Sequence, residues 1–162
     1  MVERMALRLD LIRHGEAVLH HPDGDASRPL TAAGIRAVRR LGERFAEEGW
    51  RPDLVLASPY ERAQETALLL VQMTGTTPTL LPFADLIPDR NAEDLAQAVA
   101  PLADGLAHVV LVGHQPLLGS LLLHLADAEA ALSPGFAVRL ECEPSLARGS
   151  ARLVAEYRPA SR

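Results

Sequence analysis

Residues 7–16 of this 162-residue chain read Leu-Arg-Leu-Asp-Leu-Ile-Arg-His-Gly-Glu. Leucines alternate with polar residues and Ile12 continues the apolar run, which predicts a strand that enters a hydrophobic core. The strand ends at Arg13, His14 and Gly15, where a cation, an imidazole and a residue without Cβ stand together. Because open α/β sheets bind ligands at the carboxyl ends of their strands, this turn is a candidate functional site. The alternative interpretation is solvated surface.

The composition indicates one globular domain over residues 1–162, since 48% of the residues are hydrophobic. The formal net charge is −5 and the chain has no dense basic block, which argues against nucleic acid and membrane partners. The single Cys142 excludes an internal disulfide and a cysteine-based zinc site, and it fits a reducing compartment. No signal peptide or membrane span is recognisable, so we expect a cytoplasmic protein, with a monomer favoured.

Strand and helix patterns alternate along the chain until two final strands. After the first strand, the expected elements are helices over 32–48, 59–71, 91–103 and 117–125 and strands over 54–57, 108–112, 136–143 and 151–157. Residues 74–82 are interpreted as a breaker-rich connection. This order predicts an α/β fold, a three-layer α/β/α sandwich whose central sheet is mostly parallel and carries an antiparallel C-terminal edge hairpin.

The helix over 32–48 is amphipathic and has Thr31 as its predicted cap. Four arginines lie between its apolar positions, and we interpret them as the solvent-facing side rather than as a docking site. They are Arg36, Arg39, Arg40 and Arg44. In the helix over 91–103, the spacing predicts one buried face formed by Leu95, Val99 and Leu102.

Four histidines are poorer candidates for chemistry. The adjacent His20 and His21 lie in a polar loop and are interpreted as solvated, since no third metal ligand follows at a regular spacing. His108 opens a predicted strand and His124 lies in a predicted helix. We expect both of these to have structural roles.

Three predicted strands end beside residues that suit phosphate chemistry. His14 and His114 each follow a strand, and Arg62 falls in the first turn of the helix after a third, with Pro59 in the same turn. If the strands are neighbours, two imidazoles and two guanidinium groups, those of Arg13 and Arg62, converge in one crevice. Arginine binds phosphate oxygens with a bidentate fork, and a neutral imidazole can attack phosphorus to form phosphohistidine.

Two other interpretations of these residues remain open. Arg62 could be a surface residue paired with Glu61 or Glu65. The two histidines could bind zinc, although no matching carboxylate accompanies them and two permanent cations stand beside them. We therefore expect neither a metal nor another cofactor.

The chain resembles the histidine phosphatase superfamily, also called phosphoglycerate mutase-like, in three motifs that occur in the expected order. These are Leu11-Ile12-Arg13-His14-Gly15-Glu16, Ser58-Pro59-Tyr60-x-Arg62-Ala63-x-x-Thr66-Ala67 and Val112-Gly113-His114. The resemblance implies that His14 is the nucleophile that becomes phosphorylated. It also implies that Arg13, Arg62 and His114 bind the phosphoryl group and stabilise its charge. Weaker substrate-binding candidates are Gly15, Arg28 and Ser58.

A fourth segment, Asp25-x-x-Arg28-Pro29-Leu30-Thr31-x-x-Gly34, resembles the SixA-type phosphohistidine phosphatases within that superfamily. Those enzymes remove phosphate from histidine on signalling proteins such as histidine phosphotransfer domains. Larger superfamily members carry a glutamate that protonates the leaving oxygen, usually with an inserted helical cap. Here the comparable stretch, residues 85–89, contains no glutamate, and 51 residues separate Arg62 from His114.

The missing acid favours a phosphoramidate substrate, because a phosphoimidazole can take a proton on its own distal nitrogen. The missing cap favours a substrate as large as a protein. Glu16, Asp85 and Asp89 remain weak candidates for a general acid. We therefore expect a phosphohistidine phosphatase; the alternatives are a phosphatase of small phosphomonoesters and a non-catalytic phosphate- or phosphohistidine-binding module.

Overall fold

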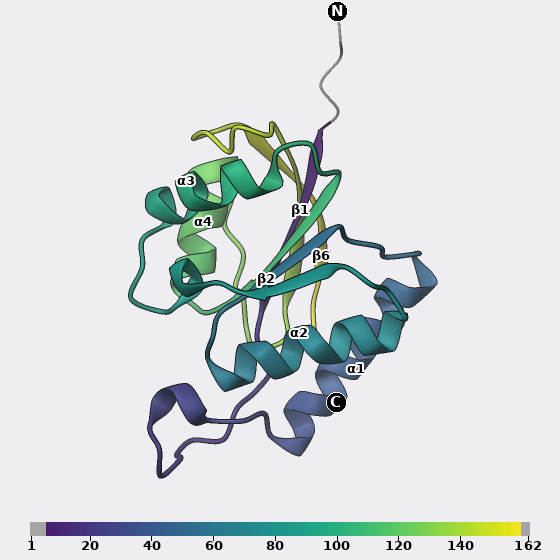
Figure 1. The fold of residues 1–162 in the computed structure, drawn as a ribbon, viewed down its shortest axis with the longest axis vertical. Coiled ribbons are helices and arrows are strands. Elements are labelled where there is room, and N and C mark those ends of the chain that lie inside the picture. The colour runs from purple at the N-terminus through teal and green to yellow at the C-terminus, as the bar shows by residue number, and fades with distance from the viewer. Residues whose placement is uncertain (1–5, 160–162) are drawn as a thin grey trace, which may run out of the picture.

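The computed structural model describes residues 6–159, which form a six-stranded mixed sheet with helices on both faces (Figure 1). The strands are β1 (Leu7–Arg13), β2 (Leu54–Ala57), β3 (Thr79–Pro82), β4 (His108–Gly113), β5 (Ala137–Cys142) and β6 (Ala151–Tyr157). The helices are α1 (Ala32–Glu47), α2 (Glu61–Thr74), α3 (Ala92–Ala103) and α4 (Leu117–Ala126), with short 3₁₀ turns η1 (Asp25–Ser27) and η2 (Ala84–Leu86).

The strand order is β3-β2-β4-β1-β5-β6. The first four strands are parallel to one another, and β5 and β6 run antiparallel at the edge. This arrangement confirms the predicted α/β sandwich with its mostly parallel sheet and antiparallel C-terminal hairpin.

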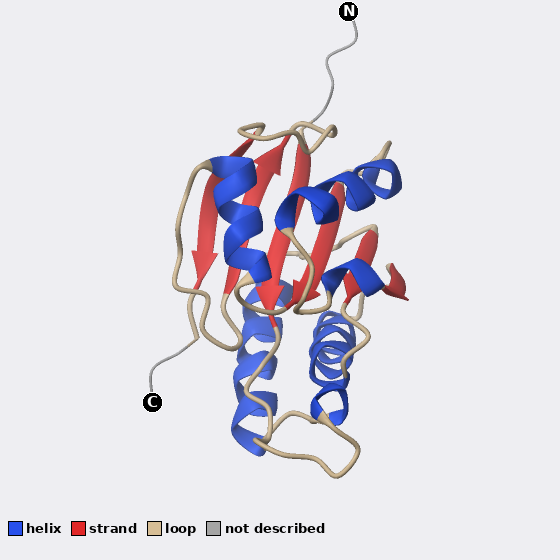
Figure 2. Ribbon diagram, turned by 90° about the vertical axis from the view of Figure 1, so that its left-hand side faces the viewer, coloured by secondary structure: helices blue, strands red, loops and turns tan. Residues whose placement is uncertain are grey.

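The sheet separates two hydrophobic cores, with α3 and α4 on one face and α1 and α2 on the other (Figure 2). Alternation along β1 sends Leu9 and Leu11 toward the first core and Ile12 toward the second. In the second core, Val38, Leu41 and Phe45 of α1 are buried at the predicted helical spacing, and the side chain of Thr31 caps the helix. The four arginines of this helix are exposed, as predicted.

Three local predictions are wrong. Residues 79–82 within the predicted connection form β3, an exposed edge strand that lacks the apolar run of the buried strands. Pro59 precedes the helix, because Tyr60 is the N-cap of α2. Leu102 is 43% exposed, and Ala103, the last residue of α3, is buried in its place.

The sheet brings the three strand ends of interest together. β4 lies between β1 and β2, with Arg13 opposite Gly113 and Ala57 opposite Val112. The next residues along these strands, His14, His114 and Ser58, therefore leave the same edge of the sheet. No helix in the described part of the chain is both long and apolar enough to span a membrane.

Candidate active site

A pocket of about 360 Å³ lies at this edge of the sheet. Its lining contains all four residues predicted to handle the phosphoryl group, Arg13, His14, Arg62 and His114, together with Glu16, Ala17, Asp25, Arg28, Pro88, Gln115 and Pro134. Three guanidinium groups face two carboxylates in this set. The pocket therefore combines imidazoles with an excess of positive charge, which suits an anion.

His14 is held in a single orientation by its neighbours. Its backbone N–H donates to the carbonyl oxygen of Gly113, and its ring Nδ1 lies 2.7 Å from the carbonyl oxygen of Gly15. A carbonyl can only accept, so Nδ1 carries a proton. Burial, together with the nearby arginine cations, lowers the pKa of His14 to about 4 against the raising effect of the hydrogen bond to Gly15. At neutral pH the ring is uncharged, and Nε2 keeps a lone pair.

Arg62 donates a hydrogen bond to that lone pair. It is 4% exposed, and its Nε donates to Nε2 of His14 at 3.3 Å. Its other nitrogens donate to the carbonyl oxygen of Asp25 at 2.7 Å and to the Asp25 carboxylate at 3.3 Å. The alternative of an ion pair with Glu61 or Glu65 is therefore wrong, and the carboxylate of Glu65 accepts from a backbone N–H elsewhere.

His114 is oriented by Ser58. The Ser58 hydroxyl accepts from the backbone N–H of Tyr60 and lies 2.7 Å from Nε2 of His114, so it can donate its own proton to that nitrogen. We assign the His114 proton to Nδ1 on this basis. Burial, together with the neighbouring His14 and arginines, lowers the pKa of His114 to about 3, so this ring is also uncharged at neutral pH.

Two buried donors at the site have no hydrogen-bond partner within the described residues. They are Nδ1 of His114 and Nε of Arg13, while another nitrogen of Arg13 donates to the carbonyl oxygen of Leu132. Unsatisfied buried polar groups are rare in proteins because desolvation without a partner is costly. The rings of His14 and His114 lie with centroids 5.0 Å apart. Together these groups form a cradle of N–H donors around the lone pair of His14.

Sequence reasoning missed two residues that support this cradle. Asp25 binds Arg28 at 2.7 Å through its carboxylate and also holds Arg62. Thr66 accepts from the backbone N–H of Gly15 at 3.0 Å and donates to the carbonyl oxygen of Arg62 at 2.8 Å. Both residues lie inside the motifs that carry the resemblance, and their spacing to Arg28 and Arg62 was the available signal.

The weaker candidates have different positions. Arg28 lines the pocket, whereas Gly15 and Ser58 act on the site through hydrogen bonds to Thr66 and His114. A Cβ on the nearby Gly34 would lie 2.2 Å from the carbonyl oxygen of Glu16. The first turn of α1 therefore presses against the segment that follows His14, which only glycine permits.

The three general-acid candidates differ in their position relative to the pocket. Glu16 lines the pocket, but its carboxylate accepts from the Thr31 hydroxyl at 2.9 Å. Asp85 and Asp89 do not line the pocket; Pro88, between them in sequence, does. The structure thus gives Asp85 and Asp89 no contact with the pocket.

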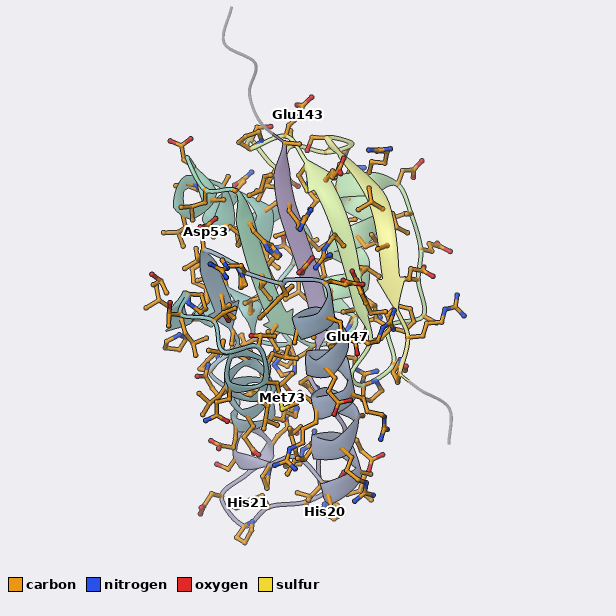
Figure 3. All side chains as sticks on the ribbon, turned by 90° about the vertical axis from the view of Figure 1, so that its right-hand side faces the viewer. His20, His21, Glu47, Asp53, Met73 and Glu143 are labelled. Atoms are coloured by element: carbon orange, nitrogen blue, oxygen red, sulfur yellow. The ribbon has the colours of Figure 1, made fainter. Side chains whose placement is uncertain are left out.

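The other histidines lie outside the site. His20 and His21 are in the loop after β1, at the opposite end of the molecule from Glu143 (Figure 3). His108 binds the buried carboxylate of Asp10 at 2.8 Å, a structural contact. Between residues 6 and 159, no cluster of three or more histidine, cysteine, aspartate or glutamate side chains is arranged to hold a metal ion.

Comparison with known proteins finds phosphatases that resemble this chain in sequence. Residues 9–83 match the family described as histidine phosphatase superfamily (branch 1). Phosphohistidine phosphatase SixA of Escherichia coli (strain K12) is 28% identical over 128 residues, which cover 76% of each chain.

Solved structures share the fold. The protein histidine phosphatase SixA complexed with tungstate superposes with a TM-score of 0.84 at 22% identity, covering 93% of this chain and 96% of that one. The alpha-ribazole phosphatase from Shigella flexneri superposes with a TM-score of 0.64 at 24% identity, covering 91% and 95%. Residues 9–83 thus match the histidine phosphatase superfamily, branch 1, and the chain is similar to SixA in sequence and fold.

Proposed function

We propose that this protein removes phosphate from phosphohistidine on a signalling protein, through a phosphorylated His14 intermediate. The observation that carries the proposal is the uncharged ring of His14, whose Nε2 lone pair faces the Arg62 guanidinium beside two buried donors without partners. A nucleophile among preorganised donors is the arrangement that phosphoryl transfer requires.

In the first step, Nε2 of His14 attacks the phosphorus atom of the substrate. A bond forms between Nε2 and phosphorus while the bond from phosphorus to the substrate imidazole breaks. Arg13, Arg62 and the Nδ1–H of His114 stabilise the charge on the phosphoryl oxygens. The carbonyl oxygen of Gly15 holds the Nδ1 proton of His14 and stabilises the positive charge that develops on that ring.

In the second step, a water molecule attacks phosphorus from the side opposite His14. Its oxygen bonds to phosphorus, the bond to Nε2 breaks, and the electron pair returns to the ring of His14. The proton lost by the water leaves with phosphate or to solvent. The enzyme returns to its starting state, so it acts catalytically without a metal or another cofactor in these steps.

Two features support phosphohistidine over a sugar phosphate. The imidazole of phosphohistidine can leave once its own distal nitrogen is protonated. Catalysis therefore does not need Asp85 or Asp89, which lie outside the pocket, as a general acid. Between Arg62 and His114 the chain is used by α2, β3, η2, α3 and β4, with no inserted cap over the pocket. A site without a cap can accept the surface of a protein.

The names of the similar proteins include both a phosphohistidine phosphatase and a phosphatase of a small phosphomonoester. The Escherichia coli relative at 28% identity is named a phosphohistidine phosphatase. The Shigella flexneri structure, which shares the fold, is named an alpha-ribazole phosphatase. Hydrolysis of small phosphomonoesters at the same site is therefore the second candidate, and phosphate binding without turnover is the third.

Rapid mixing with a phosphohistidine-bearing peptide, followed by an acid-free quench and mass spectrometry, tests the proposal. We expect phosphate on His14 that disappears with turnover, and its absence in His14→Ala. His21→Ala, in the solvated loop, is the matched control and should label normally.

Labelling by a sugar phosphate while the peptide stays inert would keep the nucleophile and replace the substrate. Binding of the peptide without labelling or phosphate release would establish the non-catalytic module instead.

A further inference from the structure

A groove continues from the active-site pocket along α4. Gln115 lines both the active-site pocket and a second pocket of about 520 Å³. Ser120 and Leu123 then line both this second pocket and a third of about 650 Å³, which reaches the first turn of α3. We call the second and third pockets together the α4 groove.

Small side chains followed by one leucine form a ridge along the α4 groove. Pro116, Gly119, Ser120 and Leu123 are spaced as i, i+3, i+4 and i+7, so they share one face of α4. Leu123 is 47% exposed at the junction of the two pockets. The small residues before it let the backbone of a partner come close, and the leucine offers that partner an apolar contact.

The charge of the α4 groove is opposite to that of the active-site pocket. Four carboxylates line it, those of Glu93, Asp94, Asp127 and Glu129. Among the described residues of its lining, Arg148 is the guanidinium that opposes them. A partner that binds both surfaces therefore carries a phosphoryl group near basic side chains.

The length of the ridge suits a helix. Leu123 lies eight positions after Gln115, which corresponds to roughly 12 Å along a helix axis. A partner helix beside α4 covers this distance in about two turns. A phosphohistidine in the active-site pocket then places a residue seven or eight positions away against Leu123.

We propose that the α4 groove docks a basic amphipathic helix of the protein substrate, the helix that carries the phosphohistidine. This inference rests on the proposed function and adds the substrate's surface to it: an apolar residue flanked by lysine or arginine, two turns from the phosphohistidine. The apolar residue contacts Leu123, and the basic residues face Glu129 and the carboxylates beyond it.

Two matched helical peptides and one small substrate test the proposal. The basic peptide carries a phosphohistidine with leucine seven residues away and lysine eight residues away, on both sides so that either helix direction is tested. The acidic peptide has glutamate for lysine, and the small substrate is phosphorylated N-acetylhistidine amide. We expect kcat/KM for the basic peptide to exceed that for the acidic peptide by about five- to tenfold at low salt.

Substitutions in the groove should change this preference alone. Glu129→Lys should abolish or reverse the charge preference, and Leu123→Ser should lower kcat/KM for the basic peptide several-fold. Neither should change turnover of the small substrate. Leu68→Ser is the matched control, because Leu68 is 49% exposed on α2, which packs on the other face of the sheet.

The outcomes separate the two proposals. Equal kcat/KM for both peptides, with normal turnover of the small substrate, would overturn the docking site and leave the function intact. If no substrate is hydrolysed, the proposed function fails. Fluorescence anisotropy with the unphosphorylated basic peptide then tests whether the α4 groove binds a basic helix. Binding that Glu129→Lys weakens supports the site, and binding unaffected by it contradicts the site.

Discussion

Ser58 and His114 are joined by a 2.7 Å hydrogen bond across 56 positions of sequence. Each residue directly follows a strand, and the parallel pairing of β2 with β4 places the two ends side by side. The bond leaves the other nitrogen of His114, Nδ1, as the donor at the site. In the proposed mechanism, this buried serine thus selects which atom of the histidine donates to a phosphoryl oxygen.

We predict that Ser58→Ala lowers kcat by about tenfold with little change in KM, because His114 then populates both neutral tautomers. ¹⁵N NMR of the imidazole nitrogens measures the tautomer directly. Ser120→Ala, on the exposed face of α4, is the control and should leave kcat with the small substrate unchanged. An unaltered kcat together with an unaltered tautomer would contradict this role for Ser58.

Arg62→Lys should lower kcat/KM by about a hundredfold. Lysine keeps the charge but cannot contact His14 and Asp25 through the separate nitrogens that the guanidinium uses. Steady-state kinetics with phosphorylated N-acetylhistidine amide measure the loss, and Arg39→Lys on the exposed side of α1 is the control. A loss of less than threefold would show that charge alone suffices at this position.

The two histidines of the site predict a pH dependence of stability. Burial lowers the pKa of His14 to about 4 and that of His114 to about 3, from an ordinary 6.5. At a pH between the folded-state pKa values and 6.5, the unfolded chain binds more protons than the folded chain. The free energy of unfolding therefore falls as the pH drops below 6.5. A pKa that is lower by one in the folded chain corresponds to about 1.4 kcal/mol, so the two histidines together contribute several kcal/mol.

Urea denaturation at pH 7, 6 and 5 measures this slope. The variant His14→Asn removes one of the two groups, and its free energy of unfolding should fall less steeply over the same range. The difference in the free energy of unfolding between the variant and the wild type should therefore shift in favour of the variant from pH 7 to pH 5. Parallel profiles for the two proteins would show that His14 titrates normally in the folded state.

Asp10→Asn should lower the free energy of unfolding by about 3 kcal/mol or more. The buried carboxylate of Asp10 accepts hydrogen bonds from Trp50, His108 and Arg139. The amide removes the directly hydrogen-bonded counter-ion of Arg139 and leaves it only the Glu48 carboxylate at 3.7 Å. Glu141→Gln, which breaks an exposed pair with Arg152, is the control and should cost less than about 1 kcal/mol by the same denaturation measurement.

The amino-acid sequence alone determines the local features of this protein, such as its buried strands and helix caps. The apolar alternation over residues 7–12 and the runs at 54–57 and 108–112 predict buried strands, because side-chain periodicity is a property of neighbouring residues. Thr31 as a helix cap and the exposed arginines of α1 follow from the same local rules. The motifs around His14 and Arg62 lie in the segment that matches the histidine phosphatase superfamily, branch 1.

The partners of each group depend on the fold. Asp25 holds Arg62 across 37 positions, and Asp10 binds Arg139 across 129, so no local pattern in the sequence predicts either pair. The edge strand β3 was missed because exposed strands need no apolar run. The protonation of His14 and His114 was likewise decided by burial and neighbouring arginines, since electrostatic energies depend on distances in space rather than on sequence.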